Sequence, residues 1–182
     1  MKSADALEKI LKSFEQYYTV STVGVPAPFC AEAVFKSHNE QYFLVKAAKV
    51  ADIDSNEFVY FYDNAVFSSS LSNGGIRSEQ AAEEESLSPN RIDELSQVAW
   101  EQGLSKVTPY YGHRNSDVTL IILSEIIPDE SFKQIKKLNH YKSYKFGLYG
   151  WSSFRALAYE TSTGRAVTNR RGSDLKKLVA SL

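Results

Sequence analysis

The sequence contains very little cysteine: Cys30 is the only one among 182 residues. A single thiol cannot form an intramolecular disulfide, which excludes the disulfide-stapled folds of small secreted proteins. A lone cysteine in an apolar stretch is usually a small buried hydrophobic residue and only rarely a nucleophile. We therefore expect a protein of a reducing compartment, the cytoplasm.

Long hydrophobic runs are also missing. The apolar positions near the N-terminus are interrupted by Asp5, Glu8, Lys9 and Lys12. Charges at this density are incompatible with a signal peptide or a membrane-spanning helix. The sequence therefore predicts no membrane partner.

Catalytic and cofactor motifs are absent as well. The three histidines, His38, His113 and His140, have no spacing that would bind zinc. The chain has no P-loop, no dinucleotide-binding glycine motif after a strand and no nucleophile elbow. We predict no catalytic residue, no metal ligand and no cofactor. One alternative stays open, in which the loop of His113 and Arg114 presents both side chains to an anion.

The chain does contain an uneven distribution of charge, which the net charge of −1 conceals. Residues 1–130 hold ten Lys/Arg and twenty Asp/Glu, whereas residues 131–182 hold eleven Lys/Arg and two acids, Glu160 and Asp174. Such asymmetry indicates an acidic or nucleic-acid partner. The alternative is that the basic segment lies against the acidic body and is neutralised there.

Length and hydrophobic periodicity predict one α+β domain spanning residues 1–182. The predicted element order is αβββαβαββα, with a mostly antiparallel sheet and helices packed on it. Helices are expected at 4–18, 89–104, 129–137 and 173–182; Ser88 is the expected N-cap of the second, whose buried stripe includes Ile92, Leu95 and Ala99. Strands are expected at 29–36, 41–50, 57–63, 117–127, 151–160 and 165–169, with a hairpin turn at 37–40 and a polar corner at 52–56. Residues 64–90, rich in serine, glycine and glutamate, are expected to form a mobile excursion.

The first six predicted elements, αβββαβ, have the order found in restriction-endonuclease-like nucleases. Such an enzyme needs an Asp and a (D/E)-x-K motif on adjacent strands, because two carboxylates must share a divalent metal while the lysine acts on water or phosphate. The formal match, Asp129 with Asp174-Leu175-Lys176, falls at predicted helix starts. The predicted strands carry no such motif, so a nuclease-like enzyme, or its inactive relative, is only an alternative.

The stretch NHYKSYKFGLYGWSSFR, residues 139–155, interleaves cations with six aromatic rings. Cations bind phosphates and flat rings stack on bases, as in proteins that bind single-stranded nucleic acid. We predict a ligand-binding face made of Lys142, Tyr144, Lys145, Trp151, Arg155, Arg170 and Arg171. In the structural alternative the rings cover one end of the core, the lysines extend to water and Arg155 pairs with a carboxylate such as Glu32 or Glu160.

The C-terminal run KSYKFGLYGWSSFRALAYETSTGRAVTNRRG resembles the end of a family of small uncharacterised bacterial proteins. These share a K-S-[FY]-x-F-G-x-x-G-W core and a terminal N-[KR]-[KR]-G. The segment FCAEAVFKSHNEQYFLVKAA is similar to their early hairpin, so the resemblance covers most of the chain except residues 64–90. It implies a stand-alone intracellular bacterial protein of a family without assigned activity, and it transfers no catalytic residue.

Three functions follow as hypotheses. The first is a non-enzymatic intracellular binding module whose basic, aromatic C-terminal face meets an anionic partner: nucleic acid, an acidic protein or a phosphorylated ligand. The second is the nuclease-like, metal-dependent enzyme or its inactive relative. The third is a self-associating structural protein, a homo-oligomer in which the basic segment of one copy meets the acidic body of another.

Overall fold

The structure is a computed structural model that describes residues 1–42, 49–65, 87–180 and 182, with the backbone alone at 37–42 and 49–54. The predicted excursion at 64–90 falls largely outside the described residues. The helices and strands, in chain order, are α1 (Ser3–Phe14), β1 (Thr19–Ser21), β2 (Ala31–Tyr42), β3 (Lys49–Asp63), α4 (Pro89–Ser105), β4 (His113–Ser124), α5 (Asp129–Lys137), β5 (Tyr141–Ser143), the 3-10 helix η1 (Lys145–Gly147), β6 (Trp151–Glu160), β7 (Arg165–Thr168), the 3-10 helix η2 (Arg170–Leu175) and α6 (Lys176–Val179).

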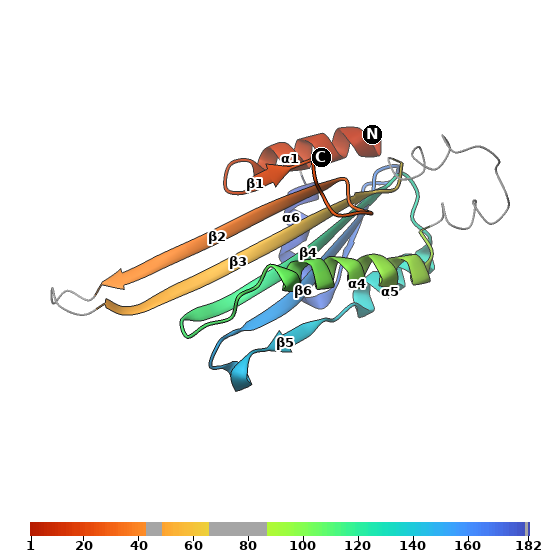
Figure 1. The fold of residues 1–182 in the computed structure, drawn as a ribbon. Coiled ribbons are helices and arrows are strands. Elements are labelled where there is room, and N and C mark those ends of the chain that lie inside the picture. Colours follow the sequence, from red (N-terminus) through yellow and green to blue (C-terminus); the bar gives the residue numbers. More distant parts are fainter. Residues whose placement is uncertain (43–48, 66–86, 181) are drawn as a thin grey trace.

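The seven described strands form one mixed sheet in the order β1-β2-β3-β4-β6-β5, with β7 also paired to β6 (Figure 1). The central strands β3, β4 and β6 are parallel, and the four pairings that flank them are antiparallel. Parallel neighbours need a long crossover connection, which α4 and α5 provide. The predicted α+β class with a mostly antiparallel sheet is confirmed, and the element order agrees approximately.

The first hairpin differs from the prediction. Residues 37–40 were expected to form a turn but belong to β2, whose register with β3 runs from Ala31↔Phe61 to Tyr42↔Lys49. Likewise the polar corner expected at residues 52–56 is part of β3. The reason is that an antiparallel ladder is held by backbone hydrogen bonds, so a polar sequence does not by itself end it.

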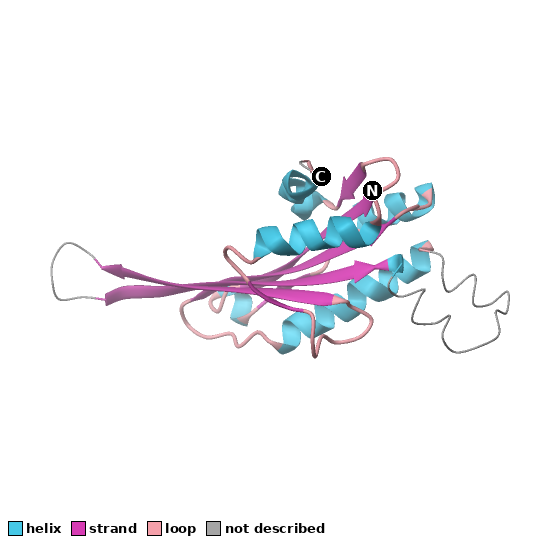
Figure 2. Ribbon diagram, turned by 90° about the horizontal axis from the view of Figure 1, so that it is seen from above, coloured by secondary structure: helices cyan, strands magenta, loops and turns pink. Residues whose placement is uncertain are grey.

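Helices cover both faces of the sheet (Figure 2). Successive strand residues alternate between two cores. The core beneath α4 and α5 includes Phe58, Tyr60, Ile92, Leu95, Leu120, Ile122, Phe132 and Phe154. The core beneath α1 and α6 includes Ile10, Phe14, Phe61, Ile121, Leu157 and Val179. The molecule is therefore a three-layer arrangement in which the central strands belong to both cores.

One helix end was predicted correctly and another was not. As expected, the Ser88 side chain caps α4 by accepting a hydrogen bond from the backbone N–H of Arg91 at 3.2 Å. The C-terminal helix does not begin at Ser173; the chain turns into η2 earlier because the Asn169 side chain accepts from the N–H of Gly172 at 3.0 Å. No described helix is both long and apolar enough to cross a membrane.

Candidate functional site

The candidate site lies at the outer edge of β6, where two short strands follow one another. β5 pairs with residues 151–153 of β6, and β7 pairs with residues 157–160. Between them, the N–H of Phe154 donates to the carbonyl of His140 at 3.0 Å, and the carbonyl of Ala156 accepts from the N–H of Asn169 at 3.1 Å. The sheet edge therefore has a break, and two chain segments meet at it.

The side chain of Asn169 fills this break. Its Oδ1 accepts from the N–H groups of Ala156 and Gly172, both at 3.0 Å. Its Nδ2 donates to the carbonyls of Leu138 at 3.1 Å and Phe154 at 3.0 Å. This one amide therefore joins the end of α5, the edge of β6 and the start of η2. All four bonds are buried, so water cannot replace them.

A pocket of about 490 Å³ opens beside the break, and we call it the edge pocket. It is lined by Lys136, Lys137, Leu138, Asn139, Asn169, Arg170 and Arg171. The two lysines form the last turn of α5, and the two arginines begin η2. The carbonyl of Leu138, which would repel an anion, is already bonded to Asn169. The polar groups that this lining offers to a ligand are therefore mainly cationic donors.

No carboxylate in the described part of the chain pairs with a cation of the edge pocket. In the C-terminal segment, ion pairs between described residues join Arg155 to Glu57 and Asp174, and Arg165 to Asp129. The other nine Lys and Arg residues of 131–182, all four pocket cations among them, pair with no carboxylate of the described chain. Counting only pairs between described residues, self-neutralisation, the alternative drawn from the charge asymmetry, accounts for two of the eleven cations.

Arg155 is the predicted binding residue whose charge is satisfied inside the fold. Its guanidinium contacts Glu57 Oε1 at 2.9 Å and also Asp174, and its side chain is only 14% exposed. Burial lowers the pKa of Arg155, but the charges of Glu57 and Asp174 outweigh it and raise this pKa above the ordinary value. Glu57 also accepts from the hydroxyls of Thr119 at 2.9 Å and Tyr18 at 2.6 Å. The carboxylate partners are thus neither Glu32 nor Glu160, and Arg155 has a structural role in this geometry.

The remaining predicted residues divide between two neighbouring places. Arg170 and Arg171 line the edge pocket, and the Arg171 guanidinium lies 5.2 Å from the ring centroid of Tyr141 on β5. Lys142 on β5 lies 5.6 Å from the ring of Tyr144. Lys145 lies on η1, just after β5, and Trp151 begins β6 opposite Ser143 of β5. β5 therefore connects the two groups (Figure 1).

Sequence reasoning missed five of the seven residues that line the edge pocket, and three of these, Lys136, Lys137 and Asn169, matter most for the proposed site. Lys136 and Lys137 looked like ordinary last-turn cations of a helix, where they complement the helix dipole. Asn169 carried no signal except its position before two arginines. What identifies all three is the break in the sheet edge, which depends on where two distant strands stop pairing with β6.

The described residues offer little for catalysis. They contain no group of three or more His, Cys, Asp or Glu side chains arranged to hold a metal ion. Burial is the main reason that the pKa of the Cys30 thiol is raised to about 11, which disfavours a thiolate nucleophile. His113 Nε2 lies 2.8 Å from Ser116 Oγ, but Ser116 is completely buried, so no substrate can reach this pair.

Comparison with known proteins gives a family and no activity. No curated protein and no solved structure matches the chain. One family model does match, over residues 2–73 and 80–181, and its description is a domain of unknown function, DUF8052. The expectation of an uncharacterised family is confirmed, while the C-terminal motif and a bacterial origin stay predictions.

Proposed function

The chain belongs to the DUF8052 family, a domain of unknown function, and from that premise we propose that it is a non-enzymatic binding module that holds phosphate groups of an anionic ligand in the edge pocket. The observation that carries this proposal is the gathering of Lys136, Lys137, Arg170 and Arg171 around one pocket of about 490 Å³. The cytoplasm is the compartment we propose for it.

A phosphate suits the charge of this lining, and the size of the pocket favours a phosphorylated ligand over an acidic protein. Arginine presents a planar fork of N–H donors that binds phosphate through two parallel hydrogen bonds, and lysine adds a compact positive charge. The exposed Asn139 adds the polar side chain of another lining residue. An acidic protein would present carboxylates over a broad surface, whereas a pocket of this volume admits a small group or one end of a chain.

The test is calorimetric titration with inorganic pyrophosphate at two salt concentrations. We expect affinity to fall as salt rises, because the pocket cations are exposed and screened. Arg170→Gln and Arg171→Gln should each weaken binding about tenfold, the usual loss when one charged hydrogen-bond donor is removed.

Lys133→Gln is the matched control. Lys133 lies on α5 like the pocket lysines but does not line the pocket, so its replacement should leave pyrophosphate affinity unchanged while Lys136→Gln lowers it. Equal losses in the two variants would mean that net charge, and no defined site, causes the binding. Binding that ignores both salt and these substitutions would refute the proposal.

The two rival functions have less support. A nuclease-like enzyme needs a metal site, and magnesium or manganese should then raise the melting temperature. Self-association should appear as a sedimentation coefficient that falls when salt is added, because opposite charges on different copies would be screened.

A further inference from the structure

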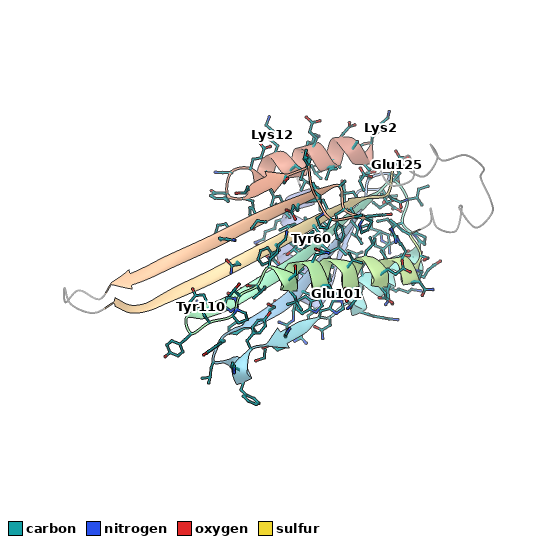
Figure 3. All side chains as sticks on the ribbon, viewed as in Figure 1. Lys2, Lys12, Tyr60, Glu101, Tyr110 and Glu125 are labelled. Carbon is teal, nitrogen blue, oxygen red and sulfur yellow. The ribbon has the colours of Figure 1, made fainter. Side chains whose placement is uncertain are left out.

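Two loops that are far apart in the sequence meet at the end of the molecule beyond β5. The N-terminal part of β4 approaches the loop 144–150 so closely that a Cβ on Gly150 would lie 2.3 Å from the carbonyl oxygen of Arg114. His113 joins the same loops, since its Nδ1 lies 2.8 Å from the carbonyl oxygen of Tyr149. Tyr110 marks this end of the molecule in Figure 3. We call residues 106–116 and 144–151 together the tip.

The tip exposes large apolar side chains, most of them aromatic. They are Tyr110, Tyr111, Phe146, Leu148 and Trp151. Phe146 is completely exposed and Tyr111 is 83% exposed, so neither ring contributes to a core. Single exposed rings are common on protein surfaces, but a group of them at one end of a molecule indicates a binding surface.

The backbone holds Phe146 outward in an unfavourable conformation. Lys145 and Phe146 have φ values of 48° and 56°, in the left-handed region that residues other than glycine, asparagine and aspartate rarely adopt. The loop is closed by hydrogen bonds from the N–H of Tyr144 to Gly150 O and from the N–H of Tyr149 to Tyr144 O. A glycine would remove this strain, so the presence of a fully exposed phenylalanine suggests a use for the ring.

The charge of the tip is positive. Residues 106–116 and 139–159 contain no Asp or Glu, and the tip and the adjoining strand β5 carry Arg114, Lys142 and Lys145 as exposed cations. Lys106, in contrast, is bound to Glu32 at 2.6 Å. Exposed cations next to open rings form a surface suited to a polyanion that also offers flat groups.

β5 runs along the margin of the sheet between α5 and η1 (Figure 1). The last turn of α5 lines the edge pocket, and η1 belongs to the tip. All three of its residues are exposed, and no described strand pairs with its outer side. Tyr141 on this strand is half exposed and lies against Arg171 of the edge pocket. Exposed cations and rings therefore lie at the edge pocket, on β5 and at the tip.

We propose that this margin binds single-stranded nucleic acid, a proposal that rests on the function proposed above and specifies its ligand. One phosphate occupies the edge pocket, the following phosphates contact Lys142 and Lys145, and unpaired bases stack on Phe146 and Tyr111. Single strands are favoured because bases in a duplex are already stacked and paired, so their faces are not available to protein rings.

The experiment compares three ligands by fluorescence anisotropy: an oligothymidylate of about ten nucleotides, an abasic strand of equal length and charge, and the oligothymidylate paired with its complement, which carries about twice the charge. We expect the oligothymidylate to bind most tightly. Phe146→Ser and Tyr111→Ser should each weaken its binding about tenfold, the usual effect of losing one base-stacking ring. Neither substitution should change the affinity for pyrophosphate.

Two further variants control for folding and for general hydrophobicity. Phe146→Gly should keep or raise the melting temperature, since glycine adopts positive φ without strain, and should still lose oligonucleotide affinity. Ile126→Ser replaces an exposed apolar residue just after the other end of β4 and should leave oligonucleotide affinity unchanged.

Equal binding of the abasic strand and the oligothymidylate, or unchanged oligonucleotide binding by the Phe146 variants, overturns the proposal. Pyrophosphate binding without oligonucleotide binding refutes this inference alone, and failure of both ligands refutes the edge pocket as well.

Discussion

At the scale of single residues, the Asn169 side chain makes hydrogen bonds to the edge of β6 that a neighbouring strand makes elsewhere in the sheet. Its amide satisfies two N–H groups and two carbonyls at the break between β5 and β7. Buried backbone groups that lose their partners are costly, because water cannot replace the bond. The edge pocket therefore depends on one side chain that is itself almost entirely buried.

Asn169→Asp should destabilise the fold strongly. The substitution keeps the shape but removes the two N–H donors to Leu138 and Phe154 and places a carboxylate beside their carbonyl oxygens. We expect a loss of about 3 kcal/mol in the free energy of unfolding, measured by urea denaturation. Asn139→Asp is the control, because Asn139 lines the same pocket but is exposed; equal effects of the two variants would contradict the assigned role.

His140 should make stability depend on pH. Burial lowers the pKa of His140 below its ordinary value of 6.5, and the nearby carboxylate of Asp93 opposes this only in part. As pH falls through 6.5, the unfolded chain binds a proton before the folded one does, so the free energy of unfolding decreases. Above 6.5 both states are neutral and the contribution is complete.

The measurement is urea denaturation of wild type and His140→Gln from about pH 8 to about pH 5. Glutamine can still bond to Ser96, which lies 3.1 Å from His140 Nε2, but it does not titrate. The wild type should lose more stability than the variant on acidification. Parallel curves for the two proteins would show that His140 does not contribute.

At the scale of elements, the ion pair of Arg155 and Glu57 joins β6 to β3 across the intervening strand β4, and Asp174 adds the contact to η2. The pair lies on the sheet face that α1 and α6 cover elsewhere. The side chains of Arg155 and Glu57 are 14% and 16% exposed, whereas those of Arg165 and Asp129 are 48% and 71% exposed. A buried charge that loses its partner is far more costly than an exposed one.

Arg155→Ala should lower the free energy of unfolding by about 3 kcal/mol, because Glu57 is left buried without a counter-charge. Asp129→Asn, which breaks the exposed pair, should leave the denaturation midpoint almost unchanged. Guanidinium melts of both variants provide the comparison. Similar midpoints for Arg155→Ala and the wild type would show that the network does not stabilise the fold.

At the scale of the whole molecule, two cores share one sheet. Neighbouring residues of β4 point to opposite sides: Leu120 and Ile122 belong to the core under α4, and Ile121 and Leu123 to the core under α1. A substitution that destabilises one core therefore also disturbs strands whose other face belongs to the second core. Such coupling predicts a single cooperative unfolding transition for the described fold.

Ile10→Ala tests this coupling from the side of α1. Removing a completely buried isoleucine side chain should cost about 2–5 kcal/mol. In a Trp151→Phe background the remaining tryptophan, Trp100, lies in the opposite core and reports on it by fluorescence. Fluorescence and far-ultraviolet circular dichroism should shift to the same lower midpoint, whereas an unshifted fluorescence transition would mean that the two layers unfold independently.

Several features that depend on residues close together in the chain were predicted correctly, and several that depend on distant segments were not. The cap at Ser88 and the buried stripe of Ile92, Leu95 and Ala99 were predicted correctly because they depend on neighbours within a few turns. The turn at residues 37–40 was predicted wrongly because strand pairing outweighed local polarity. Arg170 and Arg171 were identified by charge alone, without the pocket that they line.

The sequence by itself determined the periodicity of most helices and strands, the absence of any known catalytic motif, and the concentration of positive charge in the last fifty residues. These properties reside in local order and composition. Only the tertiary structure decided that β3, β4 and β6 run parallel, that Arg155 meets Glu57, and that four cations surround a break in the sheet edge. Each of these depends on contacts between segments far apart along the chain, whose geometry no local pattern specifies.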